Sequence, residues 1–72
     1  MKLAYYPDTD SLYVDLSSKP SVDSAEVAPG VVLDYDQDGN LVGIDIDQAS
    51  SKLDLSELVL DRIPAIVKKL TA

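Results

Sequence analysis

The chain has 72 residues, enough for one small domain that buries only about 60% of the surface of its unfolded chain. It contains no cysteine and no histidine, which excludes disulfide bonds, zinc sites built on these residues and a histidine-based catalytic triad. The net charge of −7 arises from 13 acidic and six basic side chains, and this excess disfavours nucleic acids and anionic lipids as partners.

The N-terminal stretch MKLAYYPDTD lacks the unbroken apolar core of a signal peptide. No run in the sequence approaches the roughly 20 apolar residues of a membrane span. We therefore expect a cytoplasmic protein with no membrane contact. Because no catalytic signature appears, we expect no cofactor, no catalytic residue and a non-enzymatic role.

The first half of the chain predicts three short strands. Residues 2–6 mix aromatic and aliphatic side chains and stop at PDTD, where Pro7 suits a type I turn. Every second residue is apolar in SLYVDLS, residues 11–17, which is typical of a half-buried strand. The more polar VDSAEVA, residues 22–28, is predicted to be an edge strand that ends at PG.

Residues 31–36 and 41–47 give the clearest strand patterns, and their register can be predicted. Their alternating apolar side chains share one face of the sheet only if Tyr35 lies opposite Val42. This register leaves Gln37–Asn40 as a four-residue loop, which a type I turn can close. The two strands are therefore expected to form a hairpin.

After residue 50 the apolar pattern takes on the period of a helix. Asp54 and Glu57 form a capping pair, so the helix is predicted to span residues 54–70, with a kink near Pro64. Its apolar side chains spread over roughly 220°, more than the ~100° stripe of a helix that is covered on one side. Part of its surface should therefore contact a further element or another molecule.

Together these patterns predict an α+β fold. The expected architecture is an antiparallel β-meander of four to five short strands with one C-terminal helix, kinked near Pro64. A single small domain should comprise residues 1–72, with the sheet in residues 2–47 and the helical segment in residues 54–70.

Self-association is expected from the size of the predicted core. One helix on a small sheet leaves apolar surface open, and a chain without disulfides has few other ways to supplement its core. We predict a twofold homodimer whose interface contains Leu60, Ile63, Val67 and Leu70. Pairing of edge strands and a monomer with a deeply seated helix are the alternatives.

Several motifs, taken in order, resemble one known family. They are YYPDTDSLYVDLS, AEVAPGVVLDYDQDGNLVGIDI and ASSKL, in which D-x-L-Y, PG and DxDG…VGI are the markers. This order resembles the prokaryotic family called domain of unknown function 2283 over about residues 3–53. The resemblance implies a compact antiparallel sheet with a helix, and it transfers no activity and no catalytic residue.

Residues 34–45, DYDQDGNLVGID, have the spacing of a calcium-binding loop. Asp34, Asp36 and Asp38 take the first three ligand places, a glycine follows, and Asp45 stands at the twelfth place. The flanking residues alternate and are β-branched, whereas an EF-hand needs helices on both sides. We therefore predict a hairpin turn without a metal, and a calcium site at Asp34, Asp36 and Asp38 is the alternative.

The sequence does not reveal a biochemical activity. Four outward carboxylates could pair as general acid and base, but solvation is the expected state of all four. These carboxylates belong to Asp15, Asp34, Asp45 and Asp47. The predicted role is an acidic protein-interaction module, such as an antitoxin-like or adaptor subunit, and its charge is compatible with a basic protein partner.

Overall fold

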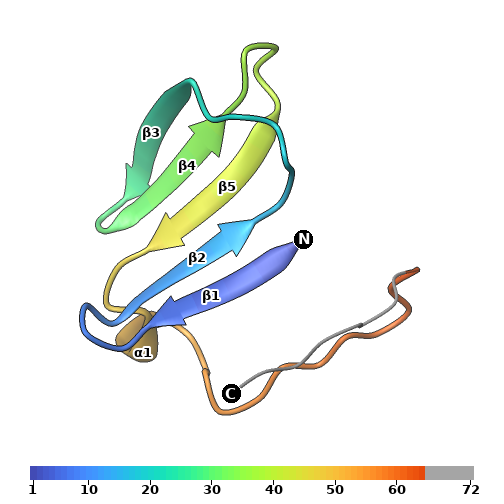
Figure 1. Cartoon of the computed structure of the whole chain (residues 1–72). Helices are drawn as coiled ribbons and strands as arrows, with labels where there is room; N and C mark the ends of the chain where they lie inside the picture. Colours follow the sequence, from blue (N-terminus) through green and yellow to red (C-terminus); the bar gives the residue numbers. More distant parts are fainter. Residues whose placement is uncertain (65–72) are drawn as a thin grey trace.

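The computed structural model describes residues 1–64, which form one five-stranded sheet followed by one short helix (Figure 1). All strand pairs are antiparallel. The elements are β1 Lys2–Tyr6, β2 Ser11–Asp15, β3 Asp23–Ala28, β4 Val31–Tyr35, β5 Leu41–Ile46 and α1 Ala49–Lys52. The α+β class and the antiparallel sheet are thus confirmed.

The strand order is β1-β2-β5-β4-β3, which differs from the predicted meander. A meander would place β3 beside β2, whereas β5 lies between β2 and β4 in a Greek-key arrangement. The chain crosses between β2 and β3 through residues 16–22, and β3 forms an edge of the sheet as predicted. Alternation along each strand marks its faces but does not encode which strands pair, so the sequence left this order open.

The β4–β5 hairpin has the predicted register over most of its length. Val31–Asp34 lie opposite the expected partners on β5. At the loop end the register shifts by one residue, so Tyr35 lies opposite Leu41 and not Val42. Such an irregularity adds one residue to one strand and bends it locally, which periodicity alone does not reveal.

One face of the sheet is apolar, and we call it the apolar face. Alternation and register place on it Leu3, Tyr5, Leu12, Val14, Val31, Leu33, Ile44 and Ile46. Leu3 and Tyr5 are 45% and 44% exposed, and the others are half-buried. Among hydrophobic residues in the described part of the chain, only Val42 and Ala49 are buried. The apolar face is therefore largely uncovered.

The helix that the structure shows in residues 1–64, α1, precedes the predicted helical segment 54–70. α1 starts after Gln48, which is left-handed with φ of 50°, and it ends at the extended Leu53. Asp54 accepts a hydrogen bond of 3.1 Å from the backbone N–H of Ser56, and residues 54–64 contain no helix. A short helix is marginal unless its apolar side is packed, and here the local turn at Asp54 forms instead.

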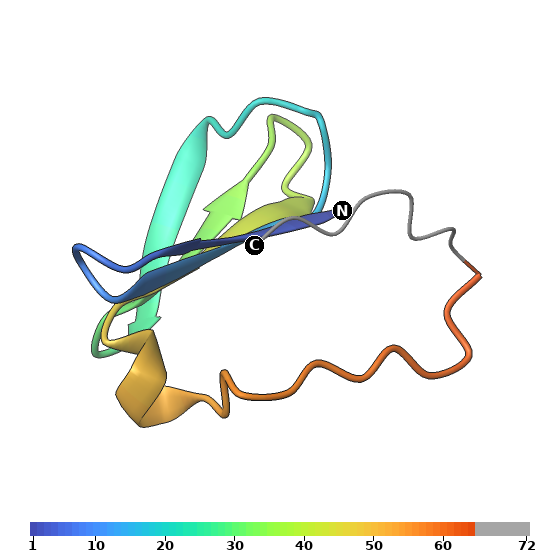
Figure 2. The ribbon, with the colours of Figure 1, turned by 60° about the horizontal axis from the view of Figure 1, so that its bottom comes forward.

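The predicted helical segment is only partly described. Its last part, residues 65–70, lies outside the described residues, and the predicted kink near Pro64 is not confirmed. Figures 1 and 2 show that residues 54–64 leave α1, pass along one side of the sheet and extend beyond it. Within residues 1–64, no helix has the length and apolar character needed to cross a membrane.

Candidate interaction surface

Tyr13 lies across the polar face of the sheet, directly over Gly43. A β-carbon at Gly43 would lie 2.0 Å from the Tyr13 hydroxyl oxygen, so only glycine admits the ring there. The Tyr13 hydroxyl donates a hydrogen bond of 3.0 Å to the Asp34 carboxylate, and the Ser24 hydroxyl donates one of 2.8 Å to its other oxygen. These contacts connect β2, β3, β4 and β5 on this face.

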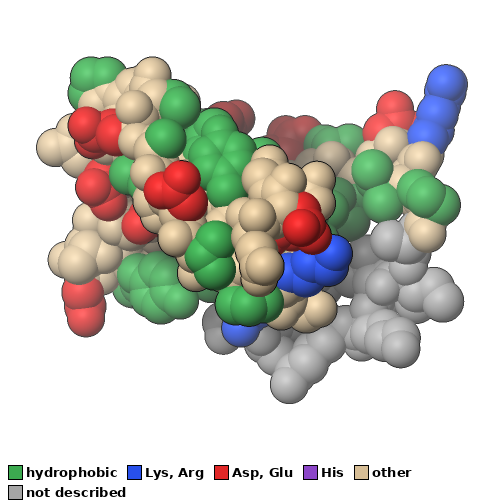
Figure 3. Space-filling view, turned by 90° about the horizontal axis from the view of Figure 1, so that it is seen from above, with side chains coloured by type: hydrophobic (Ala, Val, Ile, Leu, Met, Phe, Trp, Pro, Cys, Tyr) green, Lys and Arg blue, Asp and Glu red, His purple; other side chains and the backbone are tan. Residues whose placement is uncertain are grey.

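The same face carries carboxylates that the sequence predicted to point outward. Asp15 and Asp45 lie on the same face as Asp34. Asp45 lies opposite Tyr13, and Asp15 and Asp34 both lie opposite Gly43, from the two strands that flank β5. Desolvation by burial raises the pKa of Asp45, and nearby Asp47 and Asp34 raise it further. The hydrogen bond to Asp34 is the main cause of the raised pKa of Tyr13. In Figure 3 the acidic side chains are scattered over the surface.

The Asp36 carboxylate stabilises the β4–β5 loop through hydrogen bonds to the loop backbone. Its Oδ1 accepts hydrogen bonds from the backbone N–H groups of Asp38, at 2.9 Å, and Asn40, at 2.8 Å. The bond from the Asn40 backbone is the main cause of the lowered pKa of Asp36, whose side chain is buried. Gly39 adopts a φ of 82°, a conformation that glycine takes without strain. The loop is therefore a hairpin corner, as the strand pattern predicted.

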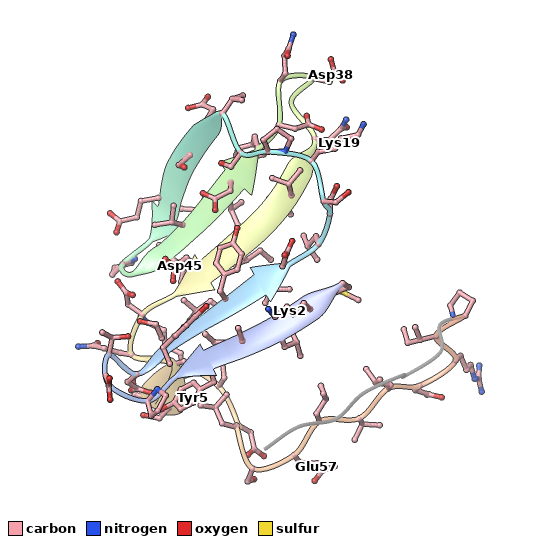
Figure 4. All side chains as sticks on the ribbon, viewed as in Figure 1. Lys2, Tyr5, Lys19, Asp38, Asp45 and Glu57 are labelled. Atoms are coloured by element: carbon pink, nitrogen blue, oxygen red, sulfur yellow. The ribbon has the colours of Figure 1, made fainter. Side chains whose placement is uncertain are left out.

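The candidate calcium ligands lie in different places. Asp34 lies on the polar face, Asp36 turns into the loop, and Asp38 stands at the loop tip, far along β5 from Asp45 (Figure 4). In residues 1–64, no three acidic side chains are grouped so that they could hold a metal ion. The calcium alternative stays a prediction, which saturable NMR shifts confined to this loop at micromolar calcium would support.

Asp10 fixes α1 to the β1–β2 turn. Its carboxylate accepts hydrogen bonds from the Ser50 backbone N–H at 3.1 Å, the Ser50 hydroxyl at 2.7 Å and the Tyr5 hydroxyl at 2.7 Å. The Asp10 carbonyl accepts a further bond of 2.8 Å from the Ala49 N–H. The Ser50 hydroxyl is the main cause of the lowered pKa of Asp10. This contact sets the point from which the chain after α1 departs.

A groove opens between the apolar face and the chain that follows α1. Its volume is about 700 Å³. The apolar side chains that line it are Leu3, Tyr5 and Leu12 from the sheet, and Leu53, Leu55 and Leu58 from the other side. We call this space the groove. The sequence did not predict it, because it forms only where α1 is docked by Asp10.

The structure describes two of the four predicted interface residues. Leu60 and Ile63 are 52% and 46% exposed, so they are free to contact another molecule. Val67 and Leu70 lie outside the described residues. The sequence did not predict that the apolar face would be uncovered, because the helix was expected to cover one face of the sheet.

Replacing Asp10 or Asp36 by Asn should lower stability at neutral pH. Both carboxyls have pKa values below the ordinary 3.8, so their stabilisation is present above that pH and is lost as the pH falls through the lowered values. Each variant should therefore lose less stability than the wild type on acidification. Urea unfolding midpoints at neutral pH and at about pH 3 measure this difference.

Asp45→Asn is the control, because the opposite change in stability is expected for this variant. Because the pKa of Asp45 is raised, its ionised form destabilises the folded chain at neutral pH. This variant should be as stable as the wild type or more stable at neutral pH. Identical midpoints for wild type, Asp10→Asn and Asp36→Asn at both pH values would refute the assigned roles.

Fold and surface together define a class of protein. It is a small single-layer antiparallel sheet with one acidic, hydrogen-bonded face and one apolar face that is open to association. The chain belongs to the family described as protein of unknown function (DUF2283), whose profile matches residues 2–50. This confirms the resemblance seen in the sequence. No curated protein and no solved structure matches the chain.

Two of the motifs that carry the resemblance have a structural explanation. In D-x-L-Y, Asp10 holds α1 and Tyr13 covers the polar face. In VGI, Gly43 leaves room for the ring of Tyr13. Both motifs therefore serve the packing of this sheet.

Proposed function

We propose that the chain is a non-enzymatic, homodimeric protein-interaction module that associates through its apolar face and the segment after α1. One observation carries this proposal: apart from the buried Val42, the large apolar side chains of the sheet are half-buried or exposed in the described residues. A domain of this size has little surplus stability, so leaving such a face in water is unfavourable. Association with a second copy would bury the apolar surface that one chain leaves exposed to water.

The carboxylates on and around the sheet support a structural rather than a catalytic role. Asp10, Asp34 and Asp36 each accept at least two hydrogen bonds from the chain itself. Each bond holds a local element, namely α1, the polar face or the β4–β5 loop. A general acid or base needs a carboxyl positioned for a substrate proton, and these three are already engaged.

The acidic surface fits a basic protein partner, in the manner of an adaptor or antitoxin-like subunit. The net charge of −7 would steer such a partner and would make the association sensitive to salt. A basic protein that copurifies at low salt and is released at high salt would support this part of the proposal. Retention at high salt would instead indicate an apolar contact.

Light scattering during gel filtration tests the homodimer. The wild-type chain at micromolar concentration should elute with twice the mass of one chain. A mass of one chain under these conditions would refute the dimer, whatever its interface.

A further inference from the structure

We infer that the groove of each copy receives residues 59–63 of a second copy, so that the two chains exchange their segments after α1 across a twofold axis. This inference rests on the proposed homodimer and names its contact. The occupant is thus an apolar segment of an identical chain.

Both walls of the groove come from one chain, and the described residues leave the space between them open. Leu53, Leu55 and Leu58 make one wall, the sheet makes the other, and about 700 Å³ lies between them. The segment that follows has large apolar side chains in residues 59–63 that are between 46% and 68% exposed. One chain therefore presents both an apolar groove and an exposed apolar segment.

The area of the sheet favours an interface that includes this segment. Five strands spaced by ~4.8 Å and about 17–20 Å long give the apolar face a footprint of roughly 400 Å². A stable interface buries about 800 Å² on each partner. Contact between two apolar faces alone falls short of this area, and docking of the segments supplies the additional surface.

The distribution of charge also favours this occupant. Residues 1–53 contain ten acidic and three basic side chains, whereas residues 54–72 contain three of each. The whole net charge of −7 therefore belongs to the sheet and α1. A second sheet brought close would add repulsion, whereas residues 59–63 carry one acidic and one basic side chain, Asp61 and Arg62, and add no net charge.

Twofold symmetry makes the arrangement self-limiting. Each copy contributes one groove and one segment, so two copies satisfy each other and leave neither feature open. Exchange of a terminal segment between identical chains is a low-cost route to a dimer, because the contacts are those that a closed monomer would otherwise make.

Cysteine cross-linking in the full chain tests the exchange, and because the chain has no native cysteine, every disulfide joins introduced thiols. Each variant oxidised alone is the blank, since a disulfide between two identical chains has the same mass. Leu3→Cys places a thiol in the groove, and Leu60→Cys places one on the segment. After the two purified variants are mixed, allowed to exchange subunits and oxidised, a disulfide should join the two different chains. The covalent product runs at twice the chain mass on a non-reducing gel.

The matched control replaces Leu3→Cys by Val27→Cys, since Val27 is similarly exposed, at 57%, but lies on β3 at the far edge. This pair should give no more than background cross-linking. An internal disulfide in the double variant Leu3→Cys/Leu60→Cys, at the mass of one chain, would overturn the exchange. A dimer by light scattering without the cross-link would overturn the exchange but keep the homodimer, and a mass of one chain would overturn both.

Discussion

Gly43→Ala should lower the free energy of unfolding by about 1–3 kcal/mol, the usual cost of overfilling a packed site. The new β-carbon would lie 2.0 Å from the Tyr13 hydroxyl oxygen, so the Tyr13 ring could no longer lie over Gly43 of β5. Its hydrogen bond to Asp34 is then lost, which adds about 1 kcal/mol. Urea unfolding of the wild type and the variant measures the difference.

Tyr13→Ala provides the control through a double-mutant cycle. Without the ring there is no clash, so Gly43→Ala in a Tyr13→Ala background should cost much less than it does in the wild type. If the cost is the same in both backgrounds, Tyr13 does not lie over Gly43.

Leu60→Asp should weaken the dimer by about 3 kcal/mol, or roughly 100-fold in the dissociation constant, because a charge would be buried at the interface without a partner. Leu60 is 52% exposed in one chain and belongs to no packed core there. Its replacement should therefore leave the secondary structure of the chain intact. Light scattering over a range of concentrations, together with circular dichroism, separates dissociation from unfolding.

Val27→Asp is the matched control, because Val27 is 57% exposed and lies on the edge strand β3. It should leave the dimer mass unchanged. Dissociation by Val27→Asp but not by Leu60→Asp would instead indicate pairing of edge strands, the alternative arrangement.

Much of the sheet could be predicted because its signals are local. Alternation marked β2, β4 and β5, turn residues bounded β1 and β3, and the need to keep apolar side chains on one face set the register of β4 on β5. The turn at Gly39 was also predictable, since residues that tolerate a positive φ are few. The family resemblance was visible over about residues 3–53, and the family profile matches residues 2–50.

Other features depend on contacts between distant residues, which the sequence pattern does not carry. The order of the strands follows from the crossing at residues 16–22, and the groove follows from the bonds between Asp10 and Ser50. Residues 54–64, the described part of the expected helix, begin with a good capping pair, but capping alone does not outweigh missing packing. The role of Gly43 appears only when Tyr13 is seen above it.

If this chain completes its core by association, the midpoint of its thermal unfolding should depend on protein concentration. Folding coupled to dimerisation makes the midpoint rise with concentration by mass action. We expect a clear rise between micromolar and near-millimolar wild-type protein. A midpoint that does not change over that range would show that one chain is stable with its apolar face uncovered, and the proposed association would then be wrong.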